Sequence, residues 1–277
     1  MTAQANDRRA DDRRQAGGAG GGEDADRATA VYVYGILPCD VEMQPGFTGV
    51  GDPPGEVRLV RNRDLAALVS DIRLDRPLGG ADDLFAHEQL LDATAGVVPV
   101  LPLRFGSVLT DDDAVAAELL DANYDQFTAA LGELDGQAEY IVKGRYRDEA
   151  VLGEVLDENP RAAALRERIR DADPDASRNG RIELGQIVSE AVAAKREEDT
   201  RALGDAVSGK VTASMVRPAT HELDAVYVAF LVAADQTERF SETVSRLADE
   251  WQDRIEVRLI GPLAAYDFVG GAPAAGL

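Results

Sequence analysis

The sequence predicts an α+β protein of two domains, each a small antiparallel sheet with helices. Short runs of alternating apolar and polar residues are typical of strands, and longer runs with apolar residues at helical spacing are typical of helices. In the second half of the chain these patterns follow one another as β-α-β-β-α-β. That order predicts a modified ferredoxin-like fold for the C-terminal domain.

Composition and pattern divide the chain into three parts. Residues 1–28 are polar, charged and Gly-rich. They bury too little apolar area to offset the entropy lost on ordering, so we expect a disordered tail. We predict an N-terminal α+β domain over 29–109 and a C-terminal ferredoxin-like α+β domain with inserted helices over 110–277.

The N-terminal domain is expected to contain three strands, a helix and a closing stretch. The strand at 31–37 ends at Pro38, and the Gly- and Pro-dense segment 45–55 is expected to be a loop. Two further runs form a hairpin across Asn62-Arg63-Asp64. The predicted bounds are a hairpin of 56–60 with 65–70 and a helix of about 81–95.

The C-terminal domain is expected to begin with a long helix. Thr110-Asp111-Asp112-Asp113 is typical of a helix N-cap with an acidic first turn, which the helix dipole favours. We predict that this helix runs to about Leu134. The remaining elements are expected as strand 138–146, helices 147–172 (interrupted at Pro160) and 183–208, strands 211–217 and 225–232, helix 237–252, and strand 255–260 ended by Gly261-Pro262.

The stretch from Pro99 to Leu109 combines strand-forming apolar residues with a charge and backbone breaks. Pro102 has no N–H for an interior ladder, so its strand belongs at a sheet edge or a bulge. Arg104 follows directly and must either reach water or meet an acidic partner. We interpret Pro102, Arg104, Phe105 and Gly106 as a partner interface. The alternative is that Arg104 holds the two domains together by pairing with a buried acid.

Acidic residues dominate the charge of the chain. There are 51 acidic residues against 29 basic ones, for a net charge of −22, and lysine occurs only at Lys143, Lys195 and Lys210. Such a surface repels phosphate backbones and anionic lipid, so we expect neither nucleic acid nor a lipid membrane as a partner. Abundant Asp with scarce Lys indicates a cytoplasm rich in salt, which screens self-repulsion.

Cysteine content and hydropathy point to an intracellular protein. Cys39 is the single cysteine, which excludes an intrachain disulfide and a multi-cysteine metal site. No run approaches the roughly 20 apolar residues of a membrane span, and the first residues lack the apolar core of a secretory signal. We therefore expect a cytoplasmic location.

Searches for catalytic motifs return nothing, so we predict no enzyme, no catalytic residue and no cofactor. His87-Glu88 begins a zinc-protease pattern, but Leu91 stands where the second histidine belongs. The glycines of 49–55 have the wrong spacing for a dinucleotide loop. No serine lies in a Gly-x-Ser-x-Gly elbow.

One loop partly matches a calcium-binding pattern. Asp175, Ser177, Asn179 and Glu183 place oxygen ligands as in an EF-hand, with Gly180 at the bend. Gln186 stands where the bidentate carboxylate should be. A calcium- or small-ligand-regulated binding module with ferredoxin-like domains is therefore the alternative function, and a loop between two helices is the structural interpretation.

Several stretches together resemble one known family. They are the opening strand with Tyr34-Gly35, the run Pro102-Leu103-Arg104-Phe105-Gly106, the strand from Glu139-Tyr140 to Lys143, the helix start Ile182-Glu183-Leu184-Gly185, and Gly261-Pro262-Leu263 with Tyr266-Asp267-Phe268. The chain is similar over roughly 30–270 to the gas vesicle accessory protein family GvpF/GvpL. Its length and acidity are most like the GvpL member of a salt-loving archaeon.

The resemblance implies two α+β domains, the second modified ferredoxin-like, and no catalysis. It implies an accessory or minor structural role in gas vesicle assembly. The expected partners are the shell protein GvpA and other accessory Gvp proteins, bound while the shell nucleates and grows, and the expected location is the cytoplasm at the vesicle. The Gly-rich tail departs from the family pattern, and its role is left open.

Overall fold

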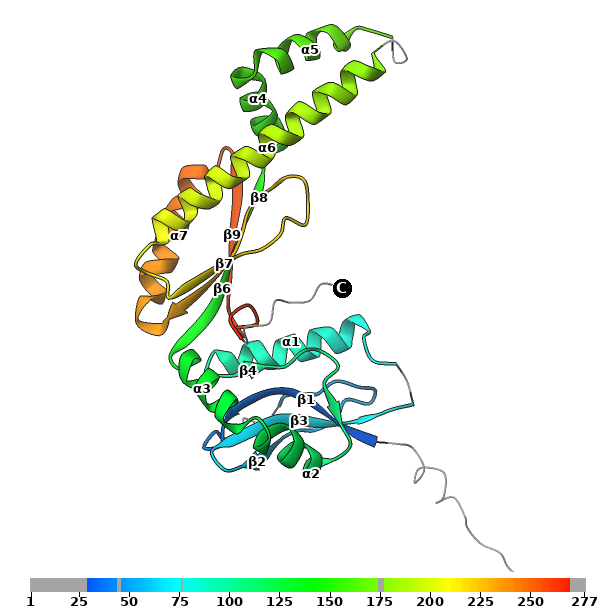
Figure 1. Ribbon diagram of the computed structural model, residues 1–277, viewed down its shortest axis with the longest axis vertical. Coiled ribbons are helices and arrows are strands. Elements are labelled where there is room, and N and C mark those ends of the chain that lie inside the picture. The colour runs from blue at the N-terminus through cyan, green and yellow to red at the C-terminus, as the bar shows by residue number, and fades with distance from the viewer. Residues whose placement is uncertain (1–28, 44–45, 76, 174–176, 270–277) are drawn as a thin grey trace, which may run out of the picture.

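The computed structural model describes residues 29–43, 46–75, 77–173 and 177–269 (Figure 1). It is a mixed helix and sheet protein with two small antiparallel sheets, which confirms the predicted α+β class. The elements of the first half are β1 (Thr29–Pro38), β2 (Val57–Asn62), β3 (Leu65–Arg73), α1 (Ala81–Ala95), β4 (Leu101–Pro102), β5 (Val108–Leu109), α2 (Asp112–Ala114), the π-helix η1 (Val115–Asp121) and α3 (Tyr124–Leu134).

The first sheet has the strand order β2-β3-β1-β4, with β5 also paired to β1. Every pairing in it is antiparallel. The predicted hairpin of β2 and β3 forms, and its turn places Arg63 at φ 56°. The predicted disordered tail, residues 1–28, lies outside the described residues.

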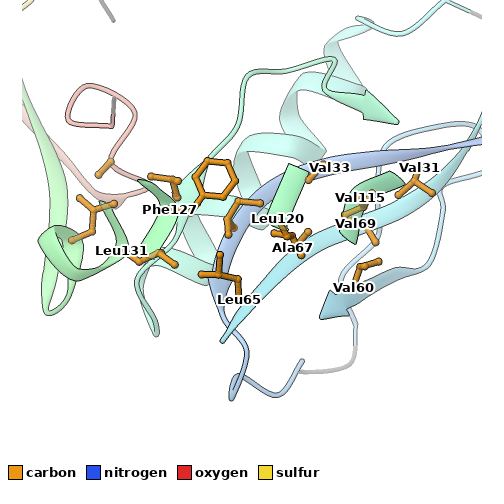
Figure 2. Close-up of a cluster of buried hydrophobic side chains, with 14 of the residues drawn as sticks. Val31, Val33, Val60, Leu65, Ala67, Val69, Val115, Leu120, Phe127 and Leu131 are labelled. Carbon is orange, nitrogen blue, oxygen red and sulfur yellow. The ribbon is translucent and has the colours of Figure 1, made fainter. Parts of the chain in front are cut away.

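Both faces of the first sheet are covered, because β1 and β3 carry apolar residues on each side. One face packs against α1 through Tyr32, Leu68, Leu90 and neighbours. The other packs against the helices that follow β5. Figure 2 shows side chains of these helices over the sheet, including Leu120, Phe127 and Leu131.

This packing bears on the expected domain division at 109/110. The helices of 112–134 pack mainly on β1, β2 and β3, and Leu231 of β8 is the buried residue of the second sheet in the same cluster. We therefore propose a division near Asp135-Gly136, directly before the second sheet begins. The reason is that a helix belongs to the sheet on which its apolar face is buried, wherever it stands in the chain.

The helix predicted from Asp111 to Leu134 is divided into three parts. The cap is Asp111, one residue after the Thr110 that begins the predicted pattern, because its Oδ1 accepts a bond from Ala114 N–H at 2.8 Å. A π-helical segment follows, and α3 begins after Asn123. The side-chain amide of Asn123 donates to the carbonyl of Leu119 at 2.8 Å, a local bond of the kind that interrupts a regular helix.

The second sheet has the order β7-β8-β6-β9, and its pairings are antiparallel. Its chain order agrees with the predicted β-α-β-β-α-β succession, and the ferredoxin-like assignment itself stays a prediction. The elements are β6 (Gln137–Tyr146), α4 (Asp148–Glu158), α5 (Pro160–Arg170), α6 (Arg178–Val207), β7 (Ala213–Val216), β8 (Asp224–Ala233), the 3-10 helix η2 (Ala234–Gln236), α7 (Thr237–Trp251) and β9 (Ile255–Leu263).

Helices α6 and α7 cover one face of the second sheet, with Leu203, Phe240 and Val244 in the shared core. Helices α4 and α5 and the first half of α6 extend away from both sheets as a helical arm (Figure 1). The predicted interruption at Pro160 is confirmed. Asn159 caps α5, since its Oδ1 accepts bonds from the N–H groups of Arg161 and Ala162, each at 3.1 Å.

Strand β9 is longer than predicted. Gly261-Pro262 was expected to end it, yet β9 continues to Leu263 and still pairs with β6 at Glu139. A register shift between Glu139 and Ile141 of β6 accommodates one extra residue of β9, because Gly261 and Pro262 lie opposite Tyr140 alone. Such a bulge is where proline and glycine are tolerated within a strand.

Candidate partner interface

The stretch 102–106 lies at an edge of the first sheet, as the sequence predicts. Strand β4 ends the strand path and pairs with β1 only at Gly35 and Ile36. The chain then leaves β1 and returns to it at β5. Residues 103–107 therefore form a turn between two short strands that pair with the same partner.

The four predicted interface residues differ in exposure. Pro102 is buried, whereas Arg104 and Gly106 are exposed. The carbonyl of Arg104 accepts bonds from Ser107 N–H and Ser107 Oγ, which closes the turn. Gly106 has φ +88°, a left-handed conformation that favours glycine. Arg104 and Gly106 are thus the two residues that this turn presents to solvent.

Phe105 points into the core on the α1 side of the sheet. Its ring makes edge contacts with Tyr32 at 5.8 Å and with His87 at 5.5 Å between centroids. The N–H of the next residue, Gly106, donates to the Tyr32 hydroxyl at 3.0 Å. The turn is therefore held in place by an aromatic cluster that local sequence pattern does not reveal.

His87 lies at the centre of this cluster and is buried. The Tyr32 hydroxyl is 3.0 Å from Nδ1, and the Tyr266 hydroxyl is 2.9 Å from Nε2. Because Tyr32 already accepts from Gly106, we assign its O–H as the donor to Nδ1, so that Nε2–H donates to Tyr266. Burial lowers the pKa of His87 to about 4, so the imidazole is neutral near pH 7.

Polar contacts between the two halves of the chain come from the segment after β9, not from Arg104. Ala264 N–H donates to Asp92 of α1 at 2.9 Å, beside the bond between Tyr266 and His87. Arg104 is exposed, and no ion pair of Arg104 occurs among the described residues. The interpretation in which Arg104 joins the domains through a buried acid is therefore wrong.

An arginine does pair with a buried acid elsewhere. Arg217 lies between two carboxylates, Glu139 at 3.2 Å and Asp267 at 2.6 Å. Glu139 also accepts from the Asp267 N–H at 3.0 Å. Burial raises the pKa of Glu139 to about 7, and the negative charge of Asp267 adds to the increase, although the Arg217 cation opposes it. This group ties the segment after β9 to β6.

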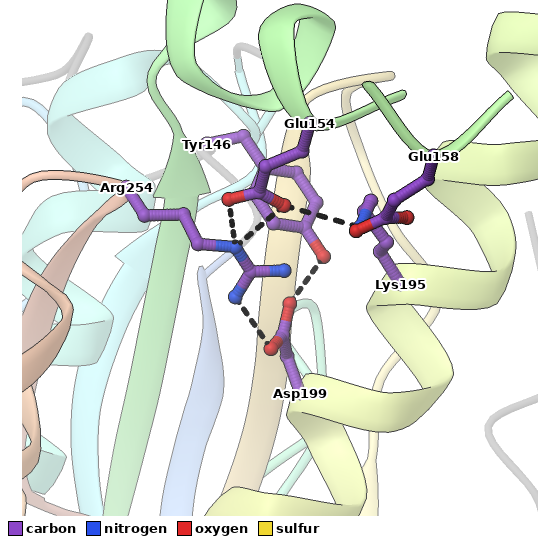
Figure 3. A network of polar contacts seen from close by, with 6 residues as sticks. All are labelled: Tyr146, Glu154, Glu158, Lys195, Asp199 and Arg254. Carbon is purple, nitrogen blue, oxygen red and sulfur yellow. Dashed lines mark hydrogen bonds and ion pairs between the residues drawn. The ribbon is translucent and has the colours of Figure 1, made fainter. Parts of the chain in front are cut away.

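A second polar network attaches the helical arm to the second sheet (Figure 3). Asp199 of α6 accepts a hydrogen bond from the Tyr146 hydroxyl at 2.6 Å. Its other carboxylate oxygen forms an ion pair with Arg254 at 2.7 Å. Arg254 also pairs with Glu154 of α4, which Lys195 of α6 reaches at 3.2 Å. Lys195 further pairs with Glu158 at 2.7 Å. The network thus joins two helices to the ends of β6 and α7.

The calcium-loop residues do not share a loop. Asn179 and Glu183 lie inside α6, which begins at Arg178, and Glu183 forms an ion pair with Arg161 of α5. Ser177 is buried and its hydroxyl donates to the carbonyl of Asp173, and Asp175 lies outside the described residues. Within the described ranges, no three His, Cys, Asp or Glu side chains are grouped so that they could hold a metal ion.

A hollow of about 720 Å³ lies along α6 beside the 219–223 loop, remote in the chain from the 102–106 turn. Its wall combines Leu184 and Val188 with the cation of Arg196. That guanidinium already donates to the carbonyls of Asp224 and Glu222, at 2.6 and 2.8 Å. Arg196 therefore holds the loop against the helix.

Fold and site together describe a two-sheet α+β protein with an exposed turn at an edge of the first sheet. Comparison with known proteins identifies its class. The family model for the gas vesicle synthesis protein GvpL/GvpF matches residues 30–270. The chain belongs to this family, which confirms the resemblance seen in the sequence.

Relatives with both family names match nearly the whole chain. Gas vesicle protein F of Streptomyces sp. (strain CB03234) is 35% identical over 243 residues, which is 87% of this chain and 99% of that protein. Gas vesicle protein L of the same strain is 30% identical, covering 86% and 92%. A haloarchaeal relative, gas vesicle protein L of Haloferax mediterranei, is 24% identical, covering 80% and 72%.

Two solved structures share the fold. The crystal structure of GvpF from Microcystis aeruginosa superposes with a TM-score of 0.69 at 22% identity, over 87% of this chain and 99% of that chain. GvpF from Anabaena sp. PCC7120 gives 0.72 at 22% identity, over 88% and 100%. Among the residues described, no helix combines the length and the apolar character that crossing a membrane requires.

Proposed function

We propose that this protein acts in gas vesicle assembly by binding the shell protein GvpA and other accessory Gvp proteins while the shell nucleates and grows. Membership of the gas vesicle synthesis family supports the pathway. The observation that carries the binding role is the edge strand β4 with the exposed turn after it. This role places the protein in the cytoplasm, at the growing vesicle.

An edge strand can add a strand from a partner, with backbone bonds for affinity and side chains for register. Strand β4 lies at the edge of the first sheet, but Pro102 supplies no N–H there, so the exposed turn that follows it provides the contact surface. Arg104, next to it, carries an exposed cation without an ion pair in the described part of the chain. Val108 of β5 is 38% exposed and adds an apolar contact. A shell protein that is strongly apolar needs a protein of this kind to cover its apolar surface before assembly.

A capture experiment tests the interface. Tagged protein is mixed with GvpA, and the double variant Arg104→Glu with Val108→Ser is compared with the unchanged chain. Phe105 is kept, because it packs against Tyr32 and His87 and its loss would destabilise the fold. We expect the variant to lose most GvpA capture while its unfolding temperature is retained.

The control is Arg168→Glu on α5, an exposed arginine far along the chain from the turn. It should capture GvpA as the unchanged chain does. Undiminished capture by the folded double variant would remove this turn from the interface. Deletion of the gene tests the pathway separately, since cells without the protein should no longer float.

The alternative of a calcium-regulated module gains no support from the helical placement of Asn179 and Glu183. Calorimetry with calcium in molar salt tests it directly. Binding heat that disappears in Glu183→Gln would favour this alternative over the assembly role.

A further inference from the structure

Strand β7 is an edge of the second sheet that carries exposed apolar side chains. It pairs with β8 on one side, and in the described part of the chain no strand pairs with its other side. Met215 is 45% exposed and Val216 is 64% exposed. An edge strand with exposed apolar side chains and unpaired backbone groups is a template for pairing with another chain.

The strand register shows which backbone groups of β7 face away from β8. The Arg217 N–H donates to the carbonyl of Tyr227 at 2.8 Å, directly after the opposed residues Val216 and Val228. Opposed residues on antiparallel strands alternate between bonded and non-bonded pairs. Val216 and Ser214 are therefore the non-bonded residues of β7, and their N–H and carbonyl groups point outward. This edge thus offers alternating donors and acceptors to an added strand.

The exposed side chains of β7 lie on both faces of the sheet. Val216 is opposite Val228, whose side chain belongs to the core shared with α6 and α7. Met215 is opposite Ala229 and, by alternation, lies on the other face. A strand added beside β7 would meet an apolar side chain on each face. Cross-strand packing therefore favours an occupant with apolar residues at successive positions.

Other edge strands of the molecule carry the features that usually prevent strand addition. Strand β9 has the exposed charges of Glu256 and Arg258 and contains Pro262. Strand β2 has the exposed Arg61, and β4 and β5 are only two residues long. Charges, proline and short length all disfavour pairing at an edge. The run 211–216, which includes β7, has neither a charge nor a proline.

We propose that β7 binds an extended, apolar segment of a partner polypeptide as an added strand. The outward groups of Ser214 and Val216 supply the backbone bonds, and the side chains of Met215 and Val216 supply the apolar contacts. The added strand continues the second sheet beyond β7. This site is separate from the 102–106 turn, which belongs to the first sheet, and it does not depend on the role of that turn in GvpA capture.

A second copy of this chain fits the edge less well than a partner segment does. Two antiparallel β7 strands would exchange bonds only between Ser214 and Val216, because Pro218 lacks the N–H for the next bonded pair. Each copy would also bring a net charge of −22, and like charges repel. An uncharged segment without proline is subject to neither limit.

The binding test uses a short fluorescein-labelled peptide of valine, isoleucine and threonine, with an ethylene glycol spacer that keeps it in solution. Fluorescence anisotropy gives its dissociation constant with the full chain in molar KCl. We expect Val216→Lys to weaken binding at least about tenfold, because a charge on an edge strand opposes strand addition. Ser214→Pro removes an outward N–H, leaves the bonds to β8 in place and should weaken binding as well. Circular dichroism and thermal unfolding confirm that each variant folds.

The same peptide with an N-methylated backbone tests the proposal on the unchanged chain, where no variant has to fold. It keeps its side chains but has no N–H groups to donate to the carbonyls of Ser214 and Val216. It should bind at least about tenfold more weakly than the unmethylated peptide.

The matched control is Ile182→Lys on α6, which adds the same charge at an apolar residue that is 55% exposed on the helical arm. It should bind the peptide as the unchanged chain does. Equal loss in this control would overturn the proposal. So would equal binding of the methylated peptide, unchanged affinity in the folded Val216→Lys variant, or absence of peptide binding by the unchanged chain. Sedimentation that shows a dimer dissociated by Val216→Lys would assign the edge to a second copy and overturn the choice of occupant.

Discussion

The Tyr266 hydroxyl lies 2.9 Å from Nε2 of His87, although the two residues are 179 positions apart. His87 belongs to α1 on the first sheet, and Tyr266 follows the last strand of the second. The same imidazole receives the Tyr32 hydroxyl on its other nitrogen. One neutral histidine therefore links the core behind the 102–106 turn to the segment that closes the second half of the chain.

Acid should weaken the fold through His87. Its pKa is about 4 in the native protein, below the ordinary 6.5, because the imidazole is buried. As the pH falls, the imidazole of His87 takes up a proton in the unfolded chain before it does so in the native protein. The contribution of neutral His87 to the unfolding free energy is therefore full above pH 6.5 and is lost as the pH falls through 4. The expected loss is about 3 kcal/mol of unfolding free energy. Urea unfolding across this range measures it.

His87→Gln should remove this pH dependence, since an amide does not titrate. The other histidine provides the control: His221 is exposed, so His221→Gln should keep the dependence. If both variants gave the same acid profile as the unchanged chain, His87 would not be the titrating group.

Glu139 should act with the opposite sign over nearly the same pH range. Burial raises its pKa from 4.5 to about 7, so the native chain holds a proton that the unfolded chain has released. The contribution of protonated Glu139 to the unfolding free energy is full below pH 4.5 and is lost as the pH rises through 7. In the unchanged chain it partly cancels the effect of His87. Glu139→Gln should therefore make stability rise more steeply with pH, measured by the same urea series.

Loss of the Asp199 carboxylate should destabilise the attachment of the helical arm. Asp199→Ala leaves the Tyr146 hydroxyl without its acceptor and Arg254 with Glu154 alone. Removing one partner from a buried charge network costs about 3 kcal/mol. Chemical denaturation gives the value. Glu167→Ala, which breaks an exposed pair with Arg170, should cost under about 1 kcal/mol. Equal costs would mean that the network contributes no more than a surface pair.

Gly261→Ala should destabilise the end of β9. Gly261 has φ +140°, and a Cβ there would lie 2.7 Å from the Tyr140 ring and 2.9 Å from the Glu139 carbonyl. The ring and the backbone cannot both yield, so the midpoint of thermal unfolding should fall. Gly153→Ala is the matched substitution, because its Cβ meets nothing within 4 Å inside α4. It should stabilise by about 0.5–1 kcal/mol through helix propensity. A Gly261 variant as stable as the Gly153 variant would contradict this packing.

Local pattern in the sequence determined most of the elements and the edge position of Pro102. Alternation and helical spacing are properties of neighbouring residues, so α1, the β2-β3 hairpin and the break before Pro160 could be predicted. The family resemblance came from short runs of residues in the same way. Both were available because a strand, a helix or a turn depends first on the few residues within it.

Only the tertiary structure decided which faces of the helices and strands pack against one another. It placed the 112–134 helices on the first sheet, turned Phe105 towards His87, and left Arg104 outside any ion pair in the described residues. It also set Lys143 opposite Arg258 across two strands. These contacts join residues far apart in the chain, and periodicity carries no information on which distant faces meet. The physical reason is that burial is settled by the packing of whole elements, after each element is already defined.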